Sequence, residues 1–153
     1  MIEQLIIKNS SLYCQHLIGK ARHSLLMARQ KELAPNHVSP RQANVMFIIY
    51  NLGHKATLAE IAKYTGRGVS SISIQLTRME KDGLVKKSRE IPKSVQLSFQ
   101  LTEKGTKIYK TGNKMTAYRA IFAKLTEEER QLLITTLKKV IDESDKYQAE
   151  AFK

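Results

Sequence analysis

The chain has 153 residues, with 26 Lys and Arg against 14 Asp and Glu, four His, one Cys and no Trp, for a formal net charge of +12. This length suits one domain with a buried core, and a hydrophobic content of 42% excludes wholesale disorder. The single cysteine excludes an intrachain disulfide and a multi-cysteine zinc cage and favours a reducing cytoplasm, and no apolar run approaches a membrane span. The isoelectric point near 9.9 makes nucleic acid the leading partner, ahead of an anionic membrane surface or an acidic protein.

Most of the excess positive charge lies in the middle of the chain. Formal charges sum to +4 over residues 1–54, +7 over residues 55–110 and +1 over residues 111–153. No block of five like charges occurs, so the pattern indicates a basic folded face and not a basic tail. An ordinary solvated surface is the alternative interpretation.

A long amphipathic helix is expected from Ile2 to about Glu32. Apolar side chains recur there at three- to five-residue steps, at Leu5, Leu12, Leu17, Ala21, Leu25 and Ala28. A helix of roughly thirty residues spans about 45 Å, which is longer than a small domain is wide. Another helix, such as one from a second chain, must therefore cover this stripe. Ala34-Pro35-Asn36 ends the helix.

Three shorter helices are predicted next. Ser39-Pro40-Arg41-Gln42 begins the first with an N-cap serine, a proline at the first position and a glutamine that completes a capping box, and Gly53 ends it. A second capping box, Thr57–Glu60, opens a short helix that stops at Gly66. The third helix follows Arg67-Gly68, ends at Asp82-Gly83 and carries one apolar face formed by Val69, Ile72, Leu76 and Met79.

The hydrophobic period then changes from 3.6 to 2, which indicates a β-hairpin. Leu84–Lys87 forms one strand, a polar turn surrounds Pro92, and the second strand alternates polar residues with Val95, Leu97, Phe99 and Leu101. A long helix is expected from Thr102 to about Leu125. A capping box at Thr126–Glu129 opens the last helix, whose apolar stripe contains Leu133, Leu137, Val140, Ile141 and Tyr147.

This order of elements predicts a mainly α, α+β winged helix-turn-helix, in which one helix enters the major groove of DNA and the hairpin contacts the flanking backbone or minor groove. The third helix is the recognition helix, and its candidate DNA-binding residues are Ser70, Ser71, Ser73, Ile74, Gln75 and Arg78. Serine suits phosphate, glutamine suits adenine, and arginine suits guanine or phosphate. Ile74 could contact a thymine methyl group or be a scattered surface apolar residue.

Three segments in this order resemble the MarR (multiple antibiotic resistance regulator) family of bacterial transcription factors: Ser70–Ser73, Arg78–Val85 and Leu101–Gly105. With the long flanking helices, the resemblance covers essentially the whole chain. The family's wing commonly carries an Asp-x-Arg triplet, but the corresponding positions here look like Lys93-Ser94-Val95. The candidate wing contacts are therefore Lys87, Arg89 and Lys93.

The resemblance implies a cytoplasmic homodimer that regulates transcription, more often as a repressor, in response to a ligand. Residues 1–32 and 106–153 would form the helical dimerisation region, and residues 38–105 the DNA-binding lobe. Two-fold symmetry then implies a palindromic duplex site with half-sites about 34–36 Å apart. Two alternatives stay open: a winged-helix module that binds a ligand or protein without specific DNA recognition, and an architectural DNA-binding protein without sequence preference.

The sequence does not identify the effector. Tyr13, Arg29, Tyr118 and Arg119 could line a pocket for a small anionic or aromatic molecule, although ordinary packing explains them equally well. Cys14 could resemble the reactive cysteine of a peroxide-sensing branch of the family, but its apolar neighbours favour a buried structural cysteine. No metal site, cofactor motif or catalytic motif is recognised, so we expect no enzyme activity.

Overall fold

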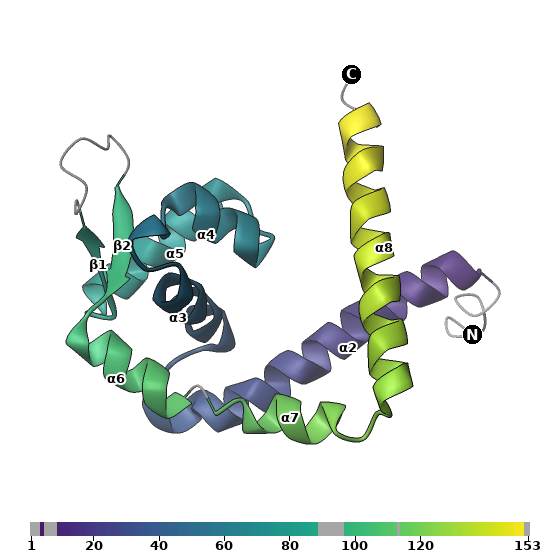
Figure 1. Cartoon of the computed structure of the whole chain (residues 1–153), viewed down its shortest axis with the longest axis horizontal. Helices are drawn as coiled ribbons and strands as arrows, with labels where there is room; N and C mark the ends of the chain where they lie inside the picture. The colour runs from purple at the N-terminus through teal and green to yellow at the C-terminus, as the bar shows by residue number, and fades with distance from the viewer. Residues whose placement is uncertain (1–3, 5–8, 89–96, 113, 152–153) are drawn as a thin grey trace. The chain divides into compact units, whose positions relative to one another are not determined.

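The computed structural model describes residue 4 and residues 9–88, 97–112 and 114–151. They belong to two compact units, residues 1–115 and residues 116–153. Within the described ranges, no helix is long and apolar enough to cross a bilayer. The first unit contains the winged helix, and its elements are traced in Figure 1.

The first described helix is α2 (Ser10–Leu33). The expected start at Ile2 is wrong, because Asn9 has an extended backbone and caps the helix by accepting a hydrogen bond from the backbone N–H of Leu12 at 3.2 Å. Leu5 of the predicted stripe lies outside the described residues. The 24 residues of α2 span about 36 Å, and the chain leaves Leu12 and Leu17 exposed along it. The short 3₁₀ helix η1 (Ala34–Asn36) ends α2 at the predicted position.

The core of the first unit is formed around α3 (Pro40–Leu52), which packs against α4 (Leu58–Thr65), against the second strand of the wing and against the helix that follows the wing. The capping box predicted at the start of α3 is confirmed. Ser39 Oγ accepts a hydrogen bond from the Gln42 N–H at 3.2 Å, and Gln42 Oε1 accepts one from the Ser39 N–H at 2.9 Å. The 3₁₀ helix η2 (Gly53–Lys55) and the N-cap Thr57 lead into α4, which stops at the left-handed Gly66.

The recognition helix is α5 (Val69–Lys81). Ile72, Leu76 and Met79 are fully buried, as the apolar period predicts. Val69 was expected on the same buried face, yet it is 52% exposed. Side chains on a helix tilt toward its N-terminus, so this first residue projects over the turn before α5 and not over the core.

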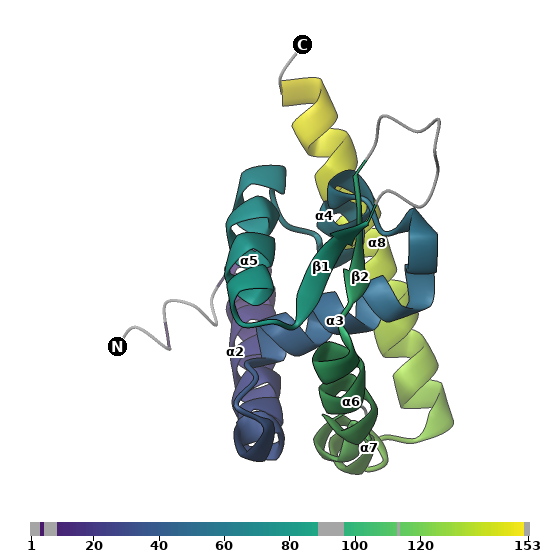
Figure 2. The same cartoon turned by 90° about the vertical axis from the view of Figure 1, so that its left-hand side faces the viewer.

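The wing consists of β1 (Val85–Ser88) and β2 (Ser98–Leu101), which lie side by side in antiparallel pairing (Figure 2). The register places Ser88 opposite Ser98. The strict alternation predicted for β2 is wrong at its start: Leu97 is 37% exposed and Ser98 only 6%. Ser98 is buried because its hydroxyl donates to the Ser88 carbonyl at 3.2 Å and its backbone bridges to Thr57. The predicted turn and Val95 lie outside the described residues.

Thr102 connects the base of the wing to α6 (Glu103–Gly112). Its hydroxyl donates to the Gly83 carbonyl at 2.6 Å and accepts from the Gly105 N–H at 3.0 Å. Its backbone N–H donates to the Leu84 carbonyl at 3.1 Å. This places the first turn of α6 so close to Leu84 that a Cβ at position 105 would lie 2.0 Å from the Leu84 carbonyl oxygen.

The single helix expected from Thr102 to Leu125 is wrong, because the chain breaks after Gly112 and resumes as α7 (Thr116–Phe122). Met115 has a left-handed backbone with φ 47°, and glycine at position 112 is a poor helix former. The buried Arg29 of α2 stabilises this end, since its Nη2 donates to the Gly112 carbonyl at 2.7 Å while its Nη1 pairs with Glu32 at 2.7 Å. Arg29 therefore fixes α2 to α6.

The second unit contains α7 and α8 (Glu127–Ala151). The predicted capping box is confirmed, because the Thr126 N–H donates to Glu129 at 2.7 Å and the Glu129 N–H donates to Thr126 Oγ1 at 3.2 Å. A hydrogen bond from Gln131, together with one from Arg130 and its charge, lowers the pKa of Glu127 below 4.5. The predicted apolar stripe is left exposed by the chain along the length of α8, at Leu133, Leu137, Val140, Ile141 and Tyr147.

Candidate nucleic-acid interface

The outward edge of α5 is the candidate surface for reading DNA. With three residues of the helix buried in the core, the helical repeat places on the opposite side the exposed residues Ser70, Ile74, Thr77, Arg78 and Lys81. Ile74 is 57% exposed. The Arg78 side chain forms no hydrogen bond or ion pair within the described part of the chain, so its guanidinium is available to a ligand.

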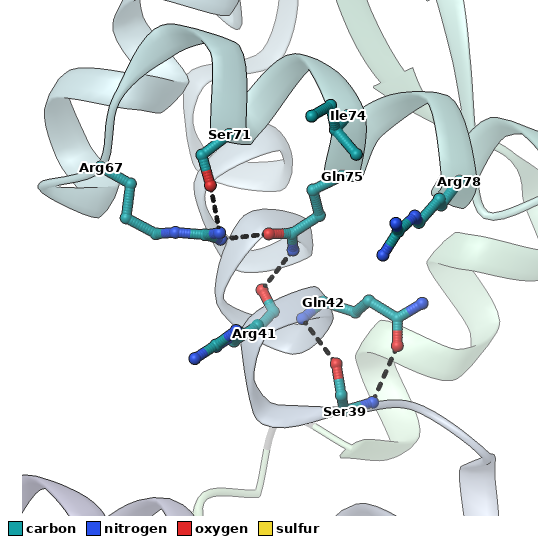
Figure 3. A pocket seen from close by; sticks show the side chains of 8 residues that line it. All are labelled: Ser39, Arg41, Gln42, Arg67, Ser71, Ile74, Gln75 and Arg78. Atoms are coloured by element: carbon teal, nitrogen blue, oxygen red, sulfur yellow. Dashed lines mark hydrogen bonds between the residues drawn. The ribbon is translucent and has the colours of Figure 1, made fainter.

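Ser71 and Gln75 lie on the flank of α5 that faces α3, and both are half-buried. Arg67, in the turn before α5, donates through Nη2 to Ser71 Oγ at 2.5 Å and through Nη1 to Gln75 Oε1 (Figure 3). The Gln75 Nε2 donates in turn to the Arg41 carbonyl in the first turn of α3 at 2.9 Å. The sequence placed these two side chains with the base-reading residues, but in the structure their polar atoms bond to other parts of the protein.

A groove of about 280 Å³ lies between the start of α3 and the flank of α5. Three arginines line it, Arg41, Arg67 and Arg78, with no carboxylate among the lining residues, which also include Ser39, Gln42, Ser71, Ile74 and Gln75. In Figure 3 the Arg67 and Arg78 side chains approach the groove from opposite ends of α5. A groove with three guanidinium groups and no acidic group favours an anion such as a phosphate.

The remaining predicted positions fall on the other flank of α5 and on the wing. Ser73 is exposed, and its carbonyl accepts a hydrogen bond from Thr77 Oγ1 at 3.0 Å. Lys87 on β1 is 55% exposed and forms an ion pair of 3.1 Å with Glu80 of α5, which connects the wing to the recognition helix. Arg89 and Lys93, the other predicted wing contacts, lie outside the described residues.

Sequence reasoning missed four residues of this surface: Arg41, Arg67, Thr77 and Lys81. Thr77 and Lys81 follow from the helical repeat once the buried stripe is reduced to Ile72, Leu76 and Met79. Arg67 could have been found from its spacing, because residues four apart on a helix lie next to each other and Ser71 and Gln75 follow it at four-residue steps. The contribution of Arg41 depends on how α3 packs against α5, which no local pattern reveals.

The predicted effector residues are placed in different surroundings. Tyr13 on α2 is 36% exposed, whereas Arg29 is 5% exposed and bonded to Gly112 and Glu32. Tyr118 on α7 is half-buried and Arg119 is exposed. Arg29 thus stabilises the contact between α2 and α6, and the structure leaves no free guanidinium there.

Cys14 was expected to be buried, and this is wrong: its side chain is exposed on α2. The apolar stripe around it suggested burial, but the chain itself does not cover that part of α2, as the exposure of Leu17 and Ile18 shows. Among the residues that the structure describes, no three His, Cys, Asp or Glu side chains gather as metal ligands would.

Comparison with known proteins assigns the winged helix. Residues 38–92, from the residue before α3 into the wing, match the family model described as the MarR family. The chain belongs to the MarR family. No curated protein sequence matches the chain.

Solved structures of MarR-like regulators agree with this assignment. The organohalide-sensing transcriptional regulator RdhR in its 2,4-dichlorophenol-bound form is 25% identical, with a TM-score of 0.78 over 88% of this chain and 81% of that one. A mutant of Escherichia coli MarR in complex with operator DNA is 20% identical, with a TM-score of 0.76 over 86% and 96% of the two chains. The transcriptional repressor CouR bound to p-coumaroyl-CoA is 21% identical, with a TM-score of 0.70 over 83% and 90%. The chain therefore has the winged-helix fold of MarR-family regulators.

Proposed function

We propose that this MarR-family chain is a homodimeric, ligand-responsive transcription regulator that represses its genes by binding palindromic duplex DNA. The observation that carries the proposal is the outward edge of α5, where the unpaired Arg78 adjoins a groove lined by three arginines. A guanidinium on an exposed helix edge has the geometry to donate two hydrogen bonds to a guanine in the major groove. The similar MarR fold found in complex with operator DNA supports the same surface.

The two long helices supply the surface for a second copy of the chain. α2 exposes Leu12, Leu17, Ile18 and Met27, and α8 exposes an apolar stripe of its own along 25 residues. Contiguous apolar surface of this extent is typical of a protein interface. We propose that residues 1–32 and 106–153 pair with those of a second chain, leaving residues 38–105 to bind DNA. The charge of only +1 over residues 111–153 lets two such regions approach without strong repulsion.

The effector is proposed to be a small aromatic or anionic molecule. RdhR is bound to a chlorinated phenol and CouR to an aromatic acyl thioester, so related folds accept aromatic ligands. Tyr13, Tyr118 and Arg119 remain the candidate contacts from this chain. Arg29 is not carried forward as a ligand contact, because its guanidinium is bonded to Gly112 and Glu32.

Arg78→Ala tests the proposal most simply. Since one bidentate contact from arginine to guanine contributes about 1–3 kcal/mol of discrimination, affinity for the preferred duplex should fall roughly 5- to 150-fold, with a much smaller loss for scrambled duplexes. The exposed Arg22→Ala on α2 is the matched control and should leave both affinities unchanged. Fluorescence anisotropy with the two duplexes measures this.

The salt dependence provides a second readout. With six to ten phosphate contacts per dimer, the logarithm of the affinity should fall with the logarithm of salt concentration at a slope of roughly −5 to −9. Equal loss on both duplexes after Arg78→Ala would assign Arg78 to the backbone. No binding of the wild-type protein to any duplex would favour the ligand- or protein-binding module, the alternative motivated by the absent wing arginine.

A further inference from the structure

Gln75 connects three parts of the winged helix through its side-chain amide. Its Oε1 accepts a hydrogen bond from Arg67, in the turn between α4 and α5. Its Nε2 donates to the Arg41 carbonyl of α3 at 2.9 Å and lies 3.9 Å from the sulfur of Met79 (Figure 3). A glutamine that reads adenine uses both atoms of its amide in the major groove. Here both atoms are already bonded inside the protein.

Arg67 is held at two points on the flank of α5. One Nη bonds to Gln75 and the other to Ser71, so two of the five N–H donors of the guanidinium are used and three remain. The side chain lines the arginine groove together with Arg41 and Arg78. A guanidinium fixed in this way loses little side-chain entropy when it binds an anion, so its remaining donors form a preorganised anion contact.

We propose that Gln75 is a positioning residue: it fixes Arg67 in the groove as a contact for a phosphate of the DNA backbone and does not itself read a base. The inference rests on the proposed function, because it assigns roles within the same DNA-binding surface. Base reading then belongs to the outward edge of α5, with Arg78 as its main polar reader. Gln75 and Arg67 instead contribute to affinity for every duplex, whatever its sequence.

The test measures affinity for a panel of duplexes that differ at one base pair each, together with the salt dependence. Gln75→Leu keeps the size of the side chain and removes both hydrogen bonds. We expect it to weaken binding by the same factor, roughly 5- to 10-fold, on every duplex of the panel, because one charge-assisted phosphate contact is loosened. Arg67→Ala should do the same and reduce the magnitude of the salt slope by about 1.

The two substitutions should not be additive. Once Arg67 is absent, Gln75→Leu has nothing left to position, so the double variant should bind like Arg67→Ala alone. Thr77→Val, on the outward edge of the same helix, is the control for general changes in α5 and should leave the salt slope unchanged. Ser71→Ala removes the second hydrogen bond to Arg67 and should give a smaller, equally nonselective loss, which keeps the test available if Gln75→Leu unfolds the lobe.

The possible outcomes separate this inference from the proposed function. If the wild-type protein selects one sequence and Gln75→Leu changes the preferred base at a single position, Gln75 is a base reader and the inference is wrong while the proposed function stands. Additive losses in the double variant also overturn the inference. If the wild-type protein binds no duplex, both the proposed function and the inference fail.

Discussion

Gly105→Ala tests how the wing is fixed to the rest of the lobe. The new Cβ would lie 2.0 Å from the Leu84 carbonyl oxygen, 3.0 Å from its carbon and 3.4 Å from Cα. All three are backbone atoms, so no side-chain rotation relieves the overlap, and α6 must move away from the wing by roughly 1 Å. That movement weakens the hydrogen bonds that Thr102 forms to Leu84 and Gly105.

The expected cost follows from these contacts. Overpacking costs about 1–3 kcal/mol and each weakened hydrogen bond about 1 kcal/mol, while alanine gains back about 1 kcal/mol of helix propensity over glycine. The net loss in the free energy of unfolding is about 2–4 kcal/mol, which lowers the melting temperature of a unit of this size by about 8–16 °C.

Thermal unfolding followed by circular dichroism measures this change. The matched control is Gly19→Ala in the middle of α2, where a Cβ meets no atom within 4 Å. That substitution should be neutral or stabilising by about 0.5–1 kcal/mol, because alanine favours helix over glycine. If Gly105→Ala melted at or above the wild-type temperature, the close packing of α6 on Leu84 would be refuted.

Two further predictions concern a buried ion pair and a carboxylate with a lowered pKa. Arg29→Met should reduce the free energy of unfolding by about 2–4 kcal/mol in urea denaturation, because it leaves the Gly112 carbonyl and Glu32 without their buried partner, whereas the exposed Arg22→Met should change it little and a loss equal to that control would contradict the structural role of Arg29. Gln131→Ala should raise the pKa of Glu127 toward 4.5 in an NMR titration, since the hydrogen bond from Gln131 is the largest cause of its lowering. A lowered folded-state pKa stabilises α8 above the unfolded value, and this contribution disappears as the pH falls through the folded value; an unchanged titration midpoint would contradict the assigned cause.

Local patterns in the sequence were sufficient to predict most of the elements of the fold. Ser39 with Gln42 and Thr126 with Glu129 form the expected capping boxes, because such caps depend only on residues three positions apart. The errors occur where distant contacts decide. Ser98 is buried by its bonds to Ser88 and Thr57, against the alternation of its strand.

The candidate site shows the same division. The buried stripe of α5 correctly identified its exposed side, including Ile74 and Arg78. The roles of Ser71 and Gln75 could not be predicted from a helical repeat, because they depend on the turn that returns Arg67 to the helix and on the packing of α3 against α5. Cys14 was assigned to a core because the sequence shows an apolar stripe but not what covers it.

Selection of bound sequences from a pool of random duplexes tests the central claim most directly. The purified full-length chain should enrich one inverted repeat whose half-sites lie about 34–36 Å apart, one turn of the duplex, as expected for a dimer with two recognition helices. The same selection with Arg78→Ala should lose the preference at one symmetric pair of positions. Recovery of duplexes without a shared sequence, or of a single unrepeated half-site, would contradict a dimeric regulator that reads DNA through the outward edge of α5.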